Sequence, residues 1–152
     1  MAKKILIIED NLAELEVSAA ELAKGDYNVI KVSSIAKAGD AIKANKPIDC
    51  LILDLNISNE FLPDGLKHKA HGGSLTGWVW LFNIAKPDLT NDPKIIIYSE
   101  FIDELEEEME TASSEEQEYY KCVVPVTKTK AVNGKEYLLQ EVNKLWSQRD
   151  KS

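Results

Sequence analysis

The chain has 152 residues and a net charge of −8 at neutral pH. Its length suits one domain with its own buried core, so we expect residues 1–152 to form a single domain. No apolar stretch approaches the roughly 20 residues of a membrane-spanning helix, and the start lacks the apolar region of a signal peptide, which predicts a cytoplasmic protein without membrane contact. Nine acidic residues and no basic residue lie between Asp103 and Glu118, so the remainder carries almost no net charge and we expect no nucleic-acid binding.

Strand-like apolar segments alternate with helical segments along the whole chain. The expected strands are residues 3–8, 27–32, 49–53, 94–98 and 121–126. The expected helices are residues 11–24, 34–45, 77–86, 102–118 and 135–148. Right-handed crossovers return each strand in the same direction, so this alternation predicts a parallel sheet in a doubly wound α/β sandwich. The active edge of such a sheet lies at the carboxyl ends of its strands.

An insertion of about residues 57–74 follows the third strand. Connections of this kind usually take roughly 2–6 residues, so a segment of this length without clear periodicity is either functional or disordered. Residues 62–65 predict a β-turn, with Phe61 and Leu66 positioned to make it a small hairpin. Trp78 and Phe82, in the helix that follows, are expected to lie partly off the core face and to pack against the insertion.

The two cysteines, Cys50 and Cys122, both fall within strand-like apolar runs. A free thiol in such a run packs as a small hydrophobic group. A disulfide between the two is disfavoured in a reducing compartment. We therefore expect two buried free cysteines.

Three acidic residues stand at strand ends. Glu9 and Asp10 follow the first strand, and Asp54 follows the third. Taken alone, the acidic pair fits a helix cap and turn, and Asp54 fits a cap of the next element. Carboxylates gathered at one edge repel each other, however, and a divalent metal ion beside a reactive aspartate relieves that repulsion.

The strand ends resemble the receiver domains of bacterial two-component response regulators, and the resemblance covers nearly the whole chain. Residues 4–11 resemble the family's first strand and acidic pair, and residues 52–56 its phospho-accepting strand end. Residues 94–99 resemble its fourth strand ending in Ser or Thr, and Lys128 lies where the family keeps a lysine. The resemblance implies a flavodoxin-like (βα)5 three-layer sandwich with strand order 2-1-3-4-5.

Mg²⁺ is the expected cofactor, because it takes an octahedron of oxygen ligands with one or two carboxylates and phosphoryl oxygens. Asp10 is the expected direct ligand and Glu9 the ligand through water. Asp54 is both ligand and phospho-acceptor. Asn56 offers its backbone carbonyl, so its side chain matters little.

Two further residues complete the expected site, since phosphoryl transfer depends mainly on positioning and charge neutralisation. Lys128 is expected to pair with Asp54 and then with the acyl phosphate. Ser99 is expected to donate its hydroxyl to a phosphoryl oxygen. Each has an ordinary alternative: Lys128 as a solvated loop lysine, and Ser99 as a helix cap.

Both histidines, His68 and His71, lie in the insertion beside Lys67 and Lys69. A metal site needs more converging ligands than these, so a solvated basic loop is favoured. Our hypothesis is that this basic loop overhangs the acidic site.

Three positions depart from the family's pattern. Pro125 replaces the usual aromatic residue three positions before the lysine, Thr129 replaces the proline after it, and Glu100 replaces the small residue after the hydroxyl residue. These changes affect the parts of a receiver that report phosphorylation.

The leading interpretation is a stand-alone receiver, not an enzyme, that takes a phosphoryl group from a sensor histidine kinase or phosphotransfer protein. It then signals by protein contacts. The acidic run at 103–118 is either a solvated surface or the docking face for a downstream protein with a basic surface. The alternatives are a pseudo-receiver that binds partners constitutively and, more remotely, a small Mg²⁺-dependent phosphotransferase or phosphatase of another doubly wound family.

Overall fold

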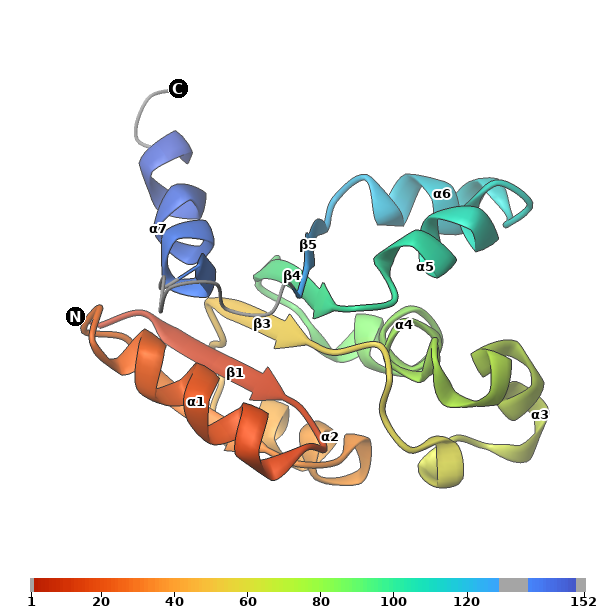
Figure 1. Ribbon diagram of the computed structural model, residues 1–152, viewed down its shortest axis with the longest axis horizontal. Coiled ribbons are helices and arrows are strands. Elements are labelled where there is room, and N and C mark those ends of the chain that lie inside the picture. Colours follow the sequence, from red (N-terminus) through yellow and green to blue (C-terminus); the bar gives the residue numbers. More distant parts are fainter. Residues whose placement is uncertain (1, 129–136, 150–152) are drawn as a thin grey trace.

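A five-stranded parallel sheet forms the centre of the protein, as seen in the computed structural model, which describes residues 2–128 and 137–149 (Figure 1). The strand order is β2-β1-β3-β4-β5, and every neighbouring pair is parallel. The strands are β1 (Lys4–Ile8), β2 (Asn28–Val32), β3 (Cys50–Leu53), β4 (Lys94–Ser99) and β5 (Val124–Thr127). The predicted flavodoxin-like order and parallel pairing are confirmed.

Helices cover both faces of the sheet. The main ones are α1 (Leu12–Ala23), α2 (Ile35–Ala44), α4 (Thr76–Trp80), α5 (Ile102–Met109), α6 (Ser114–Tyr120) and α7 (Tyr137–Arg149). A π-helical turn (Leu81–Ala85) and a 3-10 turn (Lys86–Asp88) extend α4. Asn11 and Ser34 cap α1 and α2 by accepting the backbone N–H groups of Glu14 and Lys37, as their residue types predict.

Alternation along the strands sends side chains to two separate cores. In β1, Leu6 and Ile8 pack on the side of α2, α4 and α5, whereas Ile5 and Ile7 pack on the side of α1 and α7. Because successive strand residues point to opposite faces, a run of apolar residues such as this belongs to a strand buried on both sides. The result is the predicted three-layer sandwich.

The acidic segment forms two helices, so the prediction of one helix over residues 102–118 is wrong. After α5 ends at Met109, Ser113 adopts an extended conformation and its hydroxyl accepts the backbone N–H of Glu116, 3.2 Å away, at the start of α6. A serine side chain that satisfies a helix N-terminus competes with continuation of the preceding helix. The buried stripe of α5 correspondingly stops at Met109.

The insertion is built from short helical turns, so the predicted hairpin at 61–66 is wrong. It contains a 3-10 turn at Asn59–Phe61, helix α3 (Asp64–Lys67) and a kinked 3-10 segment at His68–Gly73. The N–H of Leu66 donates to the carbonyl of Pro63 at 2.8 Å, which closes a helical turn where a β-turn was expected.

The segment before β5 also differs from expectation. β5 begins at Val124, and Cys122 lies in the turn after α6, where its N–H donates to the Tyr119 carbonyl. Cys122 is therefore exposed rather than buried, whereas Cys50 is buried as expected, and both are free thiols.

Trp78 is buried in the core, which corrects its expected position off the core face. Its ring contacts Phe82, Tyr119 and Tyr120, and its indole N–H donates to Glu116. The partner of this aromatic group is therefore α6, which the single-helix prediction did not anticipate.

None of the helices in the two described ranges is long and apolar enough to cross a membrane.

Candidate functional site

Four chain segments reach one edge of the sheet with their carboxyl ends. Ile8, at the end of β1, is paired with Leu53 of β3, and Ser99 of β4 is paired with Thr127 of β5. The residues that follow these strands, Glu9, Asp54 and Lys128, therefore emerge together. This register is why three short sequence motifs far apart in the chain form one site.

The ammonium group of Lys128 is the centre of the site. Its Nζ donates to Oδ2 of Asp54 at 2.9 Å and to Oε1 of Glu9, and it lies 3.4 Å from Oε2 of Glu14. The side chains of Glu9, Asp54 and Lys128 are only 6%, 8% and 11% exposed. The aromatic ring of Tyr98 lies on another side of the ammonium, with its centroid 5.4 Å away. Lys128 is therefore a buried, paired lysine and not a solvated loop lysine.

Burial and crowding of like charges shift two pKa values. Burial, followed by the charge of Asp54, raises the pKa of Glu9 to about 8, although its bond to Lys128 works in the opposite direction. For Lys128, burial would lower the pKa, but the charges and hydrogen bonds of Asp54 and Glu9 outweigh it, so the net shift is upward. The site thus holds its lysine charged and disfavours a second negative charge beside Asp54.

Asp10 faces the insertion. It is exposed, and its Oδ2 accepts the backbone N–H of Ser58 at 3.0 Å. Among the described residues, the carboxylates whose oxygens all lie within 4.8 Å of one another are those of Glu9, Glu14 and Asp54. The structure therefore brings Glu9 and Asp54 together as expected, and places Asp10 next to them but turned outward.

Ser99 and Asn56 lie beside the central group. Ser99 is fully buried, its Oγ accepts the N–H of Phe101 at 3.2 Å, and its carbonyl accepts the N–H of Lys128 at 2.9 Å. The side chain of Asn56 is exposed, while its backbone N–H donates to Oδ1 of Asp54 at 3.2 Å. Ser99 thus fixes the backbone of Lys128 through its carbonyl.

Two basic residues of the insertion, Lys67 and His71, pair away from Asp54. Lys67 pairs with Asp64 inside the insertion, and the two ring nitrogens of His71 face α5, with Nδ1 3.6 Å from Glu104 and Nε2 3.0 Å from Glu108. The insertion instead contacts Asp10, through the Ser58 backbone N–H. The expected basic loop over the acidic site is therefore replaced by two other contacts. The Ser58 backbone N–H meets Asp10, and the His71 imidazole meets α5.

Sequence reasoning missed two residues at this site. Glu14 lies in the first turn of α1, and its place so soon after the strand-end acidic pair was the available signal. Gly77, near the start of α4, packs against the segment that follows β3: a Cβ on it would lie 2.1 Å from the carbonyl oxygen of Asp54. A glycine at the start of the helix that follows the insertion was the available clue.

The oxygen-rich donor set fits Mg²⁺, because that ion prefers carboxylate and carbonyl oxygens over nitrogen or sulfur. Glu9 and Asp54 supply converging oxygens, and the exposed Asp10 directly follows Glu9 in the chain. The side chain of Glu14 is 47% exposed, so water and ions reach the solvent side of this group of carboxylates.

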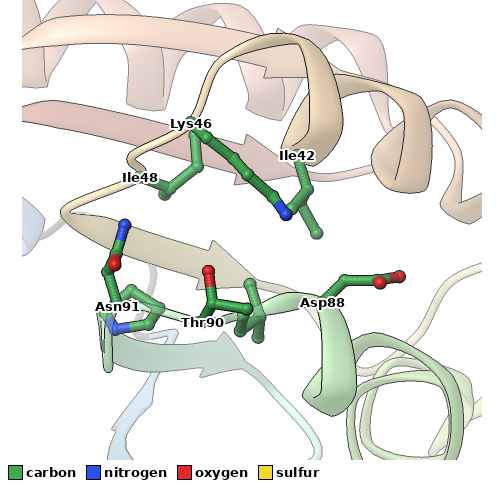
Figure 2. A pocket seen from close by; sticks show the side chains of 8 residues that line it. Ile42, Lys46, Ile48, Asp88, Thr90 and Asn91 are labelled. Carbon is green, nitrogen blue, oxygen red and sulfur yellow. The ribbon is translucent and has the colours of Figure 1, made fainter.

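A different feature, a small cavity, lies at the opposite edge of the sheet (Figure 2). Ile42, Lys46 and Ile48 line one side of it, and Asp88, Thr90 and Asn91 line the other. Its volume is about 10 Å³, room for about one water molecule.

Comparison with known proteins gives a consistent result for the fold. No family model matches the chain, and no curated protein matches it in sequence. Solved structures do match. A response-regulator receiver domain from Clostridium thermocellum superposes with a TM-score of 0.63 at 19% identity, covering 97% of each chain. A sensor protein from Polaromonas sp. JS666 gives a TM-score of 0.62 at 21% identity, over 90% of this chain and 89% of that one.

A response regulator from Thermotoga maritima, solved in complex with Mg²⁺ and BeF, gives a TM-score of 0.58 at 19% identity. It covers 94% of this chain and 98% of that one. With the strand order and parallel sheet, these likenesses define the class: the chain has the fold of response-regulator receiver domains.

Proposed function

We propose that the protein is a receiver that accepts a phosphoryl group on Asp54 in a Mg²⁺-dependent reaction and signals through protein contacts. The observation that carries this proposal is the buried pairing of Asp54 with Lys128 at the carboxyl edge of a receiver fold. A buried carboxylate with a fixed ammonium beside it is suited to receive an anionic group, because the ammonium can also bind the new phosphoryl oxygens.

In the transfer step, an Asp54 carboxylate oxygen forms a bond to phosphorus while the P–N bond to a donor histidine breaks. The imidazole keeps the electron pair of that bond and takes a proton from solvent. Lys128 and the hydroxyl hydrogen of Ser99 then bind phosphoryl oxygens. Mg²⁺, held by Glu9, Asp10, Asp54 and the backbone carbonyl of Asn56, would neutralise charge on the transferred group.

The donor in this proposal is a sensor histidine kinase or phosphotransfer protein. Its output partner is a protein with a basic surface, since α5 presents exposed acidic side chains that include Asp103, Glu106 and Glu107. Their single sign favours association with positive charge.

The test is to incubate the protein with Mg²⁺ and acetyl phosphate and to measure intact mass, with Asp54→Asn as the control. We expect a phosphoryl mass increment on the wild type and none on D54N. Beryllofluoride binding should show the same dependence on Mg²⁺ and Asp54. The absence of a mass increment and of beryllofluoride binding at millimolar Mg²⁺ would contradict the proposal.

The constitutive pseudo-receiver is not favoured, because Glu9, Asp54 and Lys128 are brought into contact. Pro125 lies exposed in β5 and Glu100 is exposed after Ser99, while Thr129 lies outside the described residues. The changed positions therefore bear on how the phosphorylated state is reported, and the mass measurement above addresses whether it forms.

A further inference from the structure

Among the described residues, Glu14 is the carboxylate in contact with Lys128 that the phosphoryl chemistry proposed above does not use. Its Oε2 lies 3.4 Å from the Lys128 ammonium, and its side chain is 47% exposed. The other two carboxylate partners of the ammonium, Glu9 and Asp54, are almost fully buried. Glu14 therefore approaches Lys128 from the solvent rim while the other two approach from inside.

The start of α1 fixes this position. Asn11 caps the helix, and its side-chain oxygen accepts the backbone N–H of Glu14 at 3.1 Å. A cap of this kind defines where the first turn begins and so where its side chains project. Because the cap uses the backbone of Glu14, replacing the side chain leaves the helix start intact.

An ammonium group has three N–H donors and no acceptor. Within residues 2–128 and 137–149, the Lys128 ammonium contacts three carboxylates, those of Glu9, Asp54 and Glu14. A phosphoryl group arriving on Asp54 brings further acceptor oxygens, so Lys128 must release a partner to bind them. The exposed pair is the easiest to break, since water screens it, whereas breaking a buried pair leaves an uncompensated charge.

We propose that Glu14 is a positioning residue that holds Lys128 in the unmodified state and weakens the binding of phosphoryl anions. This inference rests on the proposed receiver function. Glu14 acts in two ways in the same direction: it competes with the phosphoryl oxygens for the ammonium, and its negative charge stands at the rim that an anionic donor must pass.

The test compares Glu14→Gln with Glu16→Gln. Glu16 lies on the same helix and E16Q makes the same charge change, but its carboxylate pairs with Lys31 at 2.8 Å and not with the site. At saturating Mg²⁺, beryllofluoride titrated by calorimetry is expected to bind E14Q about two- to fivefold more tightly than the wild type, the range that follows from an exposed ion pair. E16Q should bind as the wild type does, and the gain in E14Q should shrink at high salt.

A second readout needs no phosphoryl analogue. An amine-acylating reagent, followed by peptide mass spectrometry, measures how freely the Lys128 amine reacts, and E14Q is expected to increase labelling of Lys128 whereas E16Q is not. Equal labelling in both variants overturns the proposal that Glu14 holds Lys128. Weaker beryllofluoride binding by E14Q at saturating Mg²⁺ overturns the proposed competition.

These outcomes separate the inference from the function on which it rests. If the wild type binds no beryllofluoride, the receiver function fails and the effect on phosphoryl affinity fails with it. The labelling result then still decides whether Glu14 holds the lysine. If the wild type binds and E14Q matches E16Q in both readouts, the receiver function stands and the role of Glu14 is refuted.

Discussion

Gly77→Ala should destabilise the protein and disturb Asp54, although alanine is the better helix former. Gly77 lies in α4, where removing a glycine from a helix interior usually gains about 0.5–1 kcal/mol. An added Cβ, however, would lie 2.1 Å from the carbonyl oxygen of Asp54 and 3.1 Å from Cα of Leu55. Those are backbone atoms, which no side-chain rotation can move away.

The magnitude follows from the two opposing terms. Overpacking of a tight contact typically costs about 1–3 kcal/mol. Separating α4 from β3 would also strain the hydrogen bond from the Gly77 N–H to the Leu55 carbonyl, 3.0 Å long and worth about 1 kcal/mol. The clash therefore outweighs the helix gain, and we expect a net loss of about 1–3 kcal/mol in the free energy of unfolding.

Gly39→Ala is the matched control, because Gly39 lies within α2 and a Cβ on it would meet no atom within 4 Å. Urea denaturation should show a gain of about 0.5–1 kcal/mol for G39A and a loss for G77A. Beryllofluoride binding should weaken only in G77A, since only that substitution pushes on the backbone of Asp54. A G77A protein as stable as G39A and with wild-type binding would refute this reasoning.

Three other substitutions test the site and its surroundings. Folding raises the pKa of Glu9 from 4.5 to about 8, so between these pH values the folded state keeps a proton that the unfolded state has lost. The free energy of unfolding, measured by urea titration with a chelator present, should therefore fall as pH rises, by up to about 1.4 kcal/mol per pH unit. Glu9→Gln should remove this slope. Thr76→Val should raise the free energy of unfolding by about 1 kcal/mol, since the Thr76 hydroxyl is buried with no hydrogen-bond partner among the described residues, and a lower value in urea denaturation would count against this. His71→Asn keeps a residue type that tolerates the left-handed backbone at φ 50° but loses both contacts with α5. It should lower the free energy of unfolding by about 0.5–1 kcal/mol and speed hydrogen exchange in residues 64–73. Unchanged exchange there would show that these contacts do not hold the insertion.

The sheet and the centre of the site were predictable because both depend on regular patterns. Apolar runs that end in Glu9 or Asp54, or just before Lys128, place their ends at one edge once the strands are parallel. No long-range information beyond the alternation of strands and helices is needed for that step. The contact among Glu9, Asp54 and Lys128 therefore follows from the strand pattern.

The rest depended on local competition that periodicity does not reveal. The break after Met109 results from a cap hydrogen bond at Ser113, which a hydrophobic stripe cannot register. The insertion folds into turns whose contacts, such as His71 with Glu108, join segments distant in sequence. Glu14 was missed for a related reason: a charged residue in a first helical turn looks solvated until the lysine that it meets is placed.

The two cores of the interior contain different tryptophans, so fluorescence can report on each face of the sheet separately. Trp78 and Trp80 lie in the layer formed with α2, α4 and α5, whereas Trp146 packs on Tyr27 in the layer formed with α1 and α7. Variants that keep either Trp78 or Trp146 as the sole tryptophan would emit from opposite sides of the same sheet. Their unfolding curves would coincide if the two layers melt together and diverge if one face opens first, so fluorescence alone can measure how cooperatively the sandwich comes apart.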